Sequence, residues 1–161
     1  MGTAGMSEGR SDERCAAFAS DPRIVLTGNL MAAAHRLTRQ LDTGLEASVG
    51  ISLAFYETMV RIRRSPAGRL TMGELANQIA LSTGGVTRLI DRLEDDGYVA
   101  RVVCPSDRRA TFLELTDAGI ECLEVATATY LALLDHFVVN RLATDDLAVV
   151  DRSLAILADE R

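Results

Sequence analysis

The segment from Leu70 to Leu115 constrains the fold more than any other part of this 161-residue chain. The run Thr71-Met72-Gly73-Glu74 has the pattern of a capping box. In that motif the threonine hydroxyl and the glutamate carboxylate each accept a hydrogen bond from the other residue's backbone N–H. The pattern predicts a short helix that runs to about Ala80, with Leu75 facing inward.

A second helix is expected almost directly after the first, with Ser82 as its N-cap. Its apolar residues recur at positions i, i+3, i+4 and i+7, which places them on one buried stripe: Val86, Leu89, Ile90 and Leu93. Asp96-Gly97 is expected to end this helix, because glycine readily adopts the left-handed conformation of a helix terminus.

Two β-strands are predicted next, at Tyr98 to Val103 and Thr111 to Leu115, because both runs are rich in β-branched and aromatic residues. The polar turn between them contains Arg108 and Arg109, so the hairpin has a basic tip. Two short helices with a tight connection and a hairpin directly after them are typical of a winged helix-turn-helix. The predicted fold class is therefore mostly α with a small β-hairpin wing.

Helices are predicted on both sides of this segment. Residues 1–20 read as a flexible tail, and Asp21-Pro22 then provides an N-cap and a proline at the first helical position. The first helix has one apolar face and is expected to end at Gly44: Leu26, Leu30, Ala34, Leu37 and Leu41. A second helix is expected from about Glu46 to Arg64, where Ser65-Pro66 stops it.

After the hairpin, Thr116-Asp117 is expected to begin a long helix that reaches about Arg141. A last helix, capped by Thr144-Asp145-Asp146, has apolar residues at spacings of three and four: Leu147, Val150, Leu154 and Leu157. Such a stripe needs another element to cover it. We therefore expect residues 21–45 and 116–161 to form a helical dimerisation region around a DNA-binding domain at 46–115.

Composition limits the class of protein. No apolar run approaches the roughly 18 residues of a membrane span, and the N-terminus has no apolar signal region, so a cytoplasmic location is expected. The three cysteines, Cys15, Cys104 and Cys122, have no CxxC spacing, which argues against disulfides and a zinc site. We find no motif of an enzyme and expect no cofactor or metal.

Five motifs in register resemble the MarR family of bacterial regulators, over the chain from about Pro22 to its end. They are Ser82 with Val86-Thr87-Arg88, the run Leu89-Ile90-Asp91-Arg92-Leu93-Glu94, Gly97-Tyr98-Val99, Asp107-Arg108-Arg109 and Leu115-Thr116-Asp117-Ala118-Gly119. The resemblance implies a homodimer with intertwined terminal helices and two wings that straddle a palindromic operator in double-stranded DNA. It also implies that many members are repressors released by small aromatic or phenolic ligands.

In this interpretation the helix from Ser82 to Asp96 is the recognition helix. The hydroxyls of Ser82, Thr83 and Thr87 can bind phosphates or base edges. Arg88 is the strongest candidate for a DNA contact, although a surface arginine paired with Asp91 or Glu94 is the alternative. Gly84 and Gly85 would permit close approach of the backbone to phosphate, and Arg92 completes the DNA-binding set on this helix.

Arg108 and Arg109 at the hairpin tip can reach the minor groove, whose negative potential attracts arginine. The resemblance implies that one wing arginine inserts while the other pairs with an aspartate of the recognition helix. Here Asp91 would pair with Arg109, and Asp107 would be a second wing-bracing residue.

Two other functions remain open from the sequence. The net charge of −6 favours a winged-helix module that binds protein without binding DNA, and the arginines at positions 88, 108 and 109 oppose it. A cysteine-based redox sensor is the other alternative, with Cys15 or Cys104 as the reactive residue. A ligand pocket, if present, is expected between the dimerisation helices and the winged domain, where Tyr56 is one of several candidate residues.

Overall fold

A computed structural model of the chain describes residues 19–79, 83–103 and 111–159, with the side chain of Thr83 outside that description. The chain divides into two units, residues 1–39 and 40–161. Helix α2 (Pro22–Val49) begins in the first unit and ends in the second.

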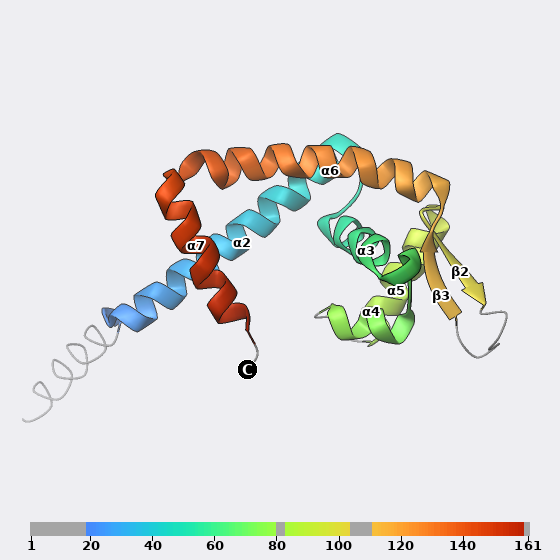
Figure 1. The fold of residues 1–161 in the computed structure, drawn as a ribbon, viewed down its shortest axis with the longest axis horizontal. Helices are drawn as coiled ribbons and strands as arrows, with labels where there is room; N and C mark the ends of the chain where they lie inside the picture. Colours follow the sequence, from blue (N-terminus) through green and yellow to red (C-terminus); the bar gives the residue numbers. More distant parts are fainter. Residues whose placement is uncertain (1–18, 80–82, 104–110, 160–161) are drawn as a thin grey trace, which may run out of the picture. The chain divides into compact units, whose positions relative to one another are not determined.

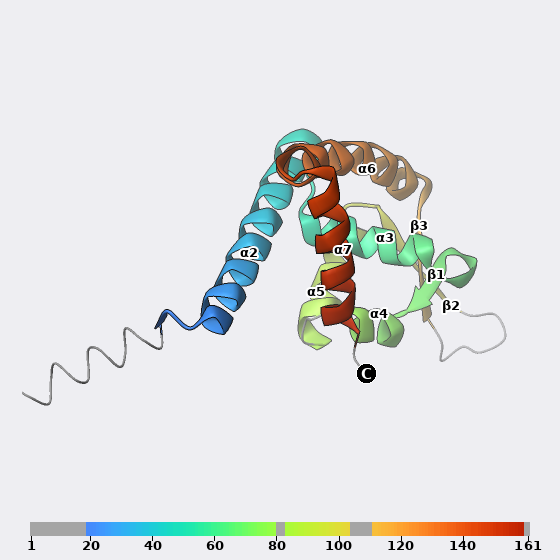
Figure 2. The same cartoon turned by 60° about the vertical axis from the view of Figure 1, so that its left-hand side comes forward.

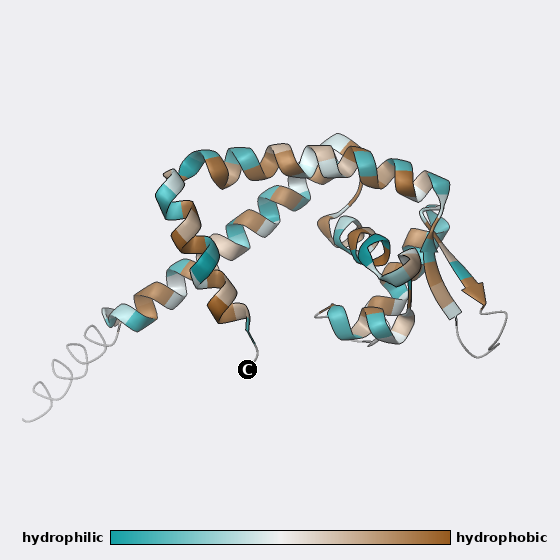
Figure 3. Ribbon diagram, in the orientation of Figure 1, coloured by the Kyte–Doolittle hydropathy of each residue, from teal (hydrophilic) through white to brown (hydrophobic). Residues whose placement is uncertain are grey.

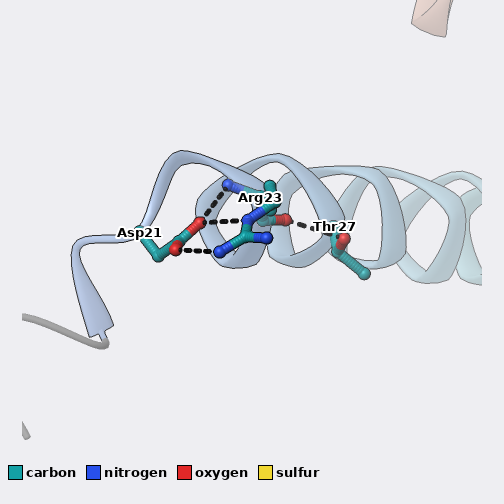
Figure 4. A network of polar contacts seen from close by, with 3 residues as sticks. All are labelled: Asp21, Arg23 and Thr27. Atoms are coloured by element: carbon teal, nitrogen blue, oxygen red, sulfur yellow. Dashed lines mark hydrogen bonds and ion pairs between the residues drawn. The ribbon is translucent and has the colours of Figure 1, made fainter.

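The start of α2 is fixed by Asp21, as predicted. The carboxylate of Asp21 accepts a hydrogen bond from the backbone N–H of Arg23 at 2.9 Å and two more from its guanidinium at 3.0 and 2.7 Å (Figure 4). These bonds with Arg23 lower the pKa of Asp21. Pro22 is the first helical residue, a position where its missing N–H costs nothing.

The predicted break at Gly44 is wrong, because α2 continues through it to Val49. A β-carbon at Gly44 would lie 2.6 Å from Cδ1 of Leu133, so the glycine allows close packing inside a continuous helix. The chain breaks instead at Gly50, which has a φ of 79°. The second helix accordingly begins later than expected, as α3 (Leu53–Arg64).

Two polar side chains fix the beginning of α3. The hydroxyl of Ser52 accepts a hydrogen bond from the backbone N–H of Phe55 at 3.2 Å, and Asp42 of α2 accepts one from the N–H of Leu53 at 2.7 Å. The helix ends at Arg64 and is followed by the 3-10 turn η1 (Pro66–Gly68). Half of its residues are buried, so α3 forms the centre of the second unit: Leu53, Phe55, Tyr56, Thr58, Met59 and Ile62.

The helix-turn-helix elements follow as predicted. In α4 (Met72–Gln78) the N–H of Glu74 donates to the Thr71 hydroxyl at 3.2 Å, and the N–H of Thr71 donates to the Glu74 carboxylate at 2.6 Å. This confirms the capping box, and these bonds lower the pKa of Glu74. Helix α5 (Thr83–Asp95) comes next. Ala80 and the predicted N-cap Ser82 lie outside the described residues.

The three strands form one antiparallel sheet in the order β1-β3-β2. Strands β2 (Val99–Val103) and β3 (Thr111–Leu115) are the predicted hairpin, and the residues of its tip, 104–110, are outside the description. The sequence interpretation missed β1 (Arg69–Thr71), which pairs Leu70 with Leu113. Three residues are too few to show a strand periodicity.

One hydrophobic core joins α3, α4 and α5 to the sheet, and these elements lie together in both views of the ribbon (Figures 1 and 2). Its fully or nearly fully buried members come from every one of those elements: Met59, Ile62, Leu70, Leu75, Val86, Ile90, Leu93, Val99 and Leu113. The observed architecture confirms the predicted fold class, mostly α with a small β wing.

Helix α6 (Asp117–Phe137) follows β3 and is capped by Thr116, whose hydroxyl accepts from the N–H of Gly119 at 3.0 Å. The 3-10 turn η2 (Val139–Arg141) and helix α7 (Thr144–Ala158) complete the chain. Ala143 occupies the N-cap position of α7 without a side-chain bond, so the prediction that Thr144 caps this helix is wrong.

The segment Asp117–Arg141 is long and apolar enough, by length and composition alone, to cross a membrane. It begins at an aspartate, and its residues Leu123 and Ala126 are buried in the second unit. The same apolar composition suits a helix that packs against protein on several sides.

Gly119 provides a test of the junction between α6 and the winged segment. A β-carbon there would lie 2.0 Å from the backbone oxygen of Tyr98, which cannot move independently of the chain. We expect Gly119→Ala to lower the free energy of unfolding by about 1–3 kcal/mol, measured by urea denaturation. Gly73→Ala is the control, because nothing lies within 4 Å of its β-carbon position. Equal effects of the two substitutions would contradict this packing.

Candidate nucleic-acid interface

Helix α5 turns one face inward and the opposite face to solvent. Val86, Ile90 and Leu93 are at most 1% exposed and form the inward stripe. The outward stripe follows the same i, i+3, i+4, i+7 spacing and is exposed throughout: Gly84, Thr87, Arg88 and Asp91. The predicted DNA-binding residues that the structure describes on this helix therefore share one accessible surface, together with the flanking Gly85 and Arg92.

Arg88 stands in the middle of this outward stripe. It is exposed, and its guanidinium makes no hydrogen bond or ion pair with any residue in the described part of the chain. The alternative of pairing with Asp91 or Glu94 is not what the structure shows, because Arg101 holds both of those carboxylates. A β-carbon at Gly84 would lie 3.9 Å from Nη2 of Arg88, so the glycine leaves the surface around this guanidinium open.

Asp91 has a partner that the sequence interpretation missed. Nη2 of Arg101, on β2, donates to Oδ1 of Asp91 at 2.6 Å, and Nη1 of the same residue donates to Oε2 of Glu94. The expected partner, Arg109, lies outside the described residues, as do Ser82, Asp107 and Arg108. The side-chain alternation of β2, which puts Arg101 on the same face as the apolar Val99, is the signal that could have indicated this pairing.

Arg92 is directed along the protein surface. Its guanidinium carbon lies 5.2 Å from the centre of the Phe55 ring in α3, within the range of a cation–π interaction. Arg92 is exposed all the same. Its assignment to the DNA-binding set stays a prediction.

Negative charge is distributed unevenly along α5. The first turn contains no acidic residue, and it lies at the positive end of the helix dipole. The acidic residues lie in the C-terminal half, at Asp91, Glu94 and Asp95, and Asp96 follows directly after the helix. An anion such as a DNA phosphate is therefore attracted to the half of the helix that contains Gly84, Thr87 and Arg88.

The end of α5 is held firmly against the strands. The N–H of Tyr98 donates to the carbonyl of Leu93 at 2.9 Å, and the N–H of Gly97 donates to that of Glu94 at 2.9 Å. These are the two bonds of a Schellman motif, and Gly97 has the φ of 77° that it requires. The predicted C-terminal glycine is confirmed, and β2 begins two residues later.

The second unit also contains a cavity. A cavity of about 620 Å³ opens between α3, η1, α4 and α6, with this lining: Tyr56, Glu57, Val60, Arg61, Arg64, Ser65, Pro66, Gln78 and Tyr130. The rings of Tyr56 and Tyr130 are stacked with their centres 4.6 Å apart. Burial raises the pKa of Tyr130, so the phenol stays neutral. Tyr56 was a sequence candidate for a pocket.

Arginines give this cavity a basic side. Nη1 of Arg61 lies 3.3 Å from the carboxylate of Glu57, so its charge is partly balanced. Arg64 is exposed and has no ion pair with a residue that the structure describes. An aromatic wall beside a free cation suits a small aromatic ligand with an acidic group.

The described residues contain no cluster of three metal-ligating side chains. Cys122 is half-buried, and burial raises the pKa of its thiol, which disfavours the reactive thiolate. The two cysteines considered as redox sensors, Cys15 and Cys104, lie outside the described residues.

The sequence and fold of the chain are similar to those of known proteins. The model of the MarR family matches residues 51–111. An uncharacterized HTH-type transcriptional regulator of Bacillus subtilis, YcgE, is 60% identical over 43 residues, which are 27% of this chain and 28% of that protein. The matched segments of three curated relatives cover 28%, 53% and 65% of those proteins' lengths.

Solved structures match over more of the chain. Sco3205, a MarR family transcriptional regulator from Streptomyces coelicolor solved in complex with DNA, is 30% identical with a TM-score of 0.75, over 83% of this chain and 84% of its own. A mutant MarR from E. coli complexed with operator DNA is 26% identical with a TM-score of 0.74, over 87% of this chain and 100% of its own.

These relatives are regulators of transcription, which agrees with the expectation that the chain is not an enzyme. The α4–α5 pair and the three-stranded sheet are the winged helix-turn-helix of such proteins. The likeness extends beyond the matched family model to the helices on either side of it. The chain belongs to the MarR family of transcriptional regulators.

Proposed function

We propose that the protein is a repressor that binds a palindromic operator as a homodimer in the cytoplasm and is released by a small-molecule ligand. The observation that carries DNA binding is the outward stripe of α5. There Arg88 is exposed, has no ion pair with any residue that the structure describes, and stands between Thr87 and the open surface at Gly84. A guanidinium in this setting is available for bidentate contacts to guanine or phosphate. Sco3205 and the E. coli mutant were each solved with DNA, which supports the proposal.

Binding to the major groove would use the N-terminal half of α5, because the carboxylates are concentrated in its C-terminal half. Ser82, Thr83, Thr87 and Arg88 would contact base edges and phosphates, and Gly84 and Gly85 would let the backbone approach. Arg108 and Arg109 would follow the minor groove from the wing, with Asp107 bracing that loop. A few cations at these places outweigh a net charge of −6, because affinity for DNA depends on the charges that reach phosphates.

Substitution of single arginines tests this arrangement. We expect Arg88→Ala and Arg108→Ala each to weaken binding to a selected operator by about 1–3 kcal/mol, without loss of thermal stability. Arg152→Ala, in α7, removes the same charge from an exposed site and is the control. The measurement is a gel-shift titration at fixed salt. If all three variants bind as the wild type does, α5 and the wing do not contact DNA.

A second copy of the chain would cover apolar surface that the described residues leave open. In α7 no residue is buried, and Leu154 and Leu157 are 45% and 70% exposed. In the first unit Leu26 and Met31 of α2 are 70% and 60% exposed. Brown segments recur along both helices in Figure 3. Exposed apolar surface of this extent, on helices with a regular apolar stripe, is typical of an oligomer interface.

Dimerisation has a direct test. We expect the wild type to have about twice the mass of the chain by light scattering. We expect Leu154→Glu to shift the protein to the monomer, because it places a charge in the apolar stripe. Asp151→Ala, on the same helix and outside that stripe, is the control. A wild type that stays monomeric at micromolar concentration would exclude a dimeric repressor.

Ligand release is supported by the cavity beside Tyr56 and Tyr130. Its aromatic wall and the cation of Arg64 suit a small aromatic or phenolic effector. Gln78 of α4 also lines the cavity, so a ligand there would contact the helix that packs against α5. Adding benzoate or phenol to the operator titration tests for this release.

A further inference from the structure

Arg101 of β2 holds two carboxylates of α5 at once. Nη2 donates to Oδ1 of Asp91 at 2.6 Å, and Nη1 donates to Oε2 of Glu94. Asp91 and Glu94 are three residues apart and lie about one turn from each other on the helix. One planar guanidinium therefore joins two points of the helix to one point of the sheet. The hydrogen bond to Asp91, with the neighbouring carboxylate, raises the pKa of Arg101, which stays charged.

The position of Arg101 in the sheet determines which elements its side chain connects. It pairs in register with the fully buried Leu113 of β3, two residues after the buried Val99, so its side chain leaves the sheet on the side that packs against α5. Strand β2 then ends at Val103, and the wing residues follow directly in the chain. Arg101 thus joins the outward-facing helix to the strand that leads into the wing.

Arg101 also neutralises two negative charges that lie next to the outward stripe of α5. The side chain of Asp91 is 50% exposed and continues the stripe of Gly84, Thr87 and Arg88. The side chain of Glu94 is 39% exposed. Arg101 is the ion-pair partner that the described part of the chain gives to both carboxylates. Without it, their negative charges would oppose the approach of phosphates to the neighbouring surface, because like charges repel over several ångströms. With Arg101, both charges are held in ion pairs.

We propose that Arg101 is a positioning residue for DNA binding, which neutralises Asp91 and Glu94 and fixes α5 relative to the wing strands without itself touching DNA. The proposal rests on the proposed function, since it takes α5 as the recognition helix. It differs from the roles of Arg88 and Arg108, whose guanidinium groups would contact DNA directly.

The test measures the dissociation constant at several salt concentrations, with a duplex that the wild-type protein selects from a random pool. We expect Arg101→Gln to weaken binding by about 10-fold while the slope of log Kd against log salt stays unchanged, because a lost phosphate contact would lower that slope by about one. Arg69→Gln is the matched control. Arg69 lies in the same sheet and pairs with the single carboxylate of Glu114 at 3.6 Å, so we expect a change of less than about 2-fold.

A triple variant distinguishes neutralisation of Asp91 and Glu94 by Arg101 from a purely structural role of Arg101. In the triple variant Asp91→Asn, Glu94→Gln and Arg101→Gln the two carboxylates that Arg101 pairs with are absent, and we expect affinity within about 3-fold of the wild type. If Arg101→Gln does not fold, by its thermal melt, Arg101→Lys replaces it. Lysine keeps the charge but lacks the planar fork, so we expect a loss of about 3-fold.

Three results would overturn the proposal: undiminished affinity of the Arg101 variant, a salt slope that falls by about one, or a triple variant that stays as weak as the single one. A wild-type protein that selects no duplex overturns the proposed function together with this one. Wild-type binding with any of the three results overturns only the role of Arg101.

Discussion

Burial of one stripe of α5 is the constraint on which the rest of the winged segment depends. Val86, Ile90 and Leu93 are almost completely buried between α3, α4 and the sheet, and each fully buried aliphatic side chain contributes about 1.5–3 kcal/mol. Because the helix can bury only this face, its rotation is fixed. Arg88 and Thr87 are therefore directed to solvent by the packing of the residues on the opposite face of the helix.

The ends of α5 are fixed by backbone geometry. Gly97 ends the helix in a left-handed conformation, Tyr98 closes the Schellman motif, and Gly119 lets the first turn of α6 lie against the backbone of Tyr98. Arg101 adds two ion pairs between the helix and β2. The outward stripe of α5 and the base of the hairpin are thus parts of one packed unit. Such packing would reduce the ordering needed on binding to DNA.

The fold was largely predictable from sequence, because local signals and packing agree in the winged segment. The capping box at Thr71 and the glycine at position 97 each have a local chemical cause, and each is confirmed. Of the predicted stripe of α5, Val86, Ile90 and Leu93 are buried, whereas Leu89 is only half-buried. The helix end predicted at Gly44 is wrong, since the contact with Leu133 that explains this glycine comes from a residue far along the chain. Arg101 was missed for a related reason: the alternation of β2 places it on the inner face of the strand, but does not identify the carboxylates of α5 that it pairs with. Of the predicted DNA-binding residues on α5, Arg88 is exposed as expected, whereas its contact with DNA is a property of the complex.

The central claim is that a small basic surface on α5 and the wing governs binding to DNA in a protein that is acidic as a whole. The most direct measurement is selection of bound duplexes from a random pool at low salt, followed by sequencing. The account predicts a palindrome whose binding weakens steeply as salt rises, as expected when several phosphates are neutralised. Recovery of duplexes without any shared sequence, or binding that does not respond to salt, would contradict it.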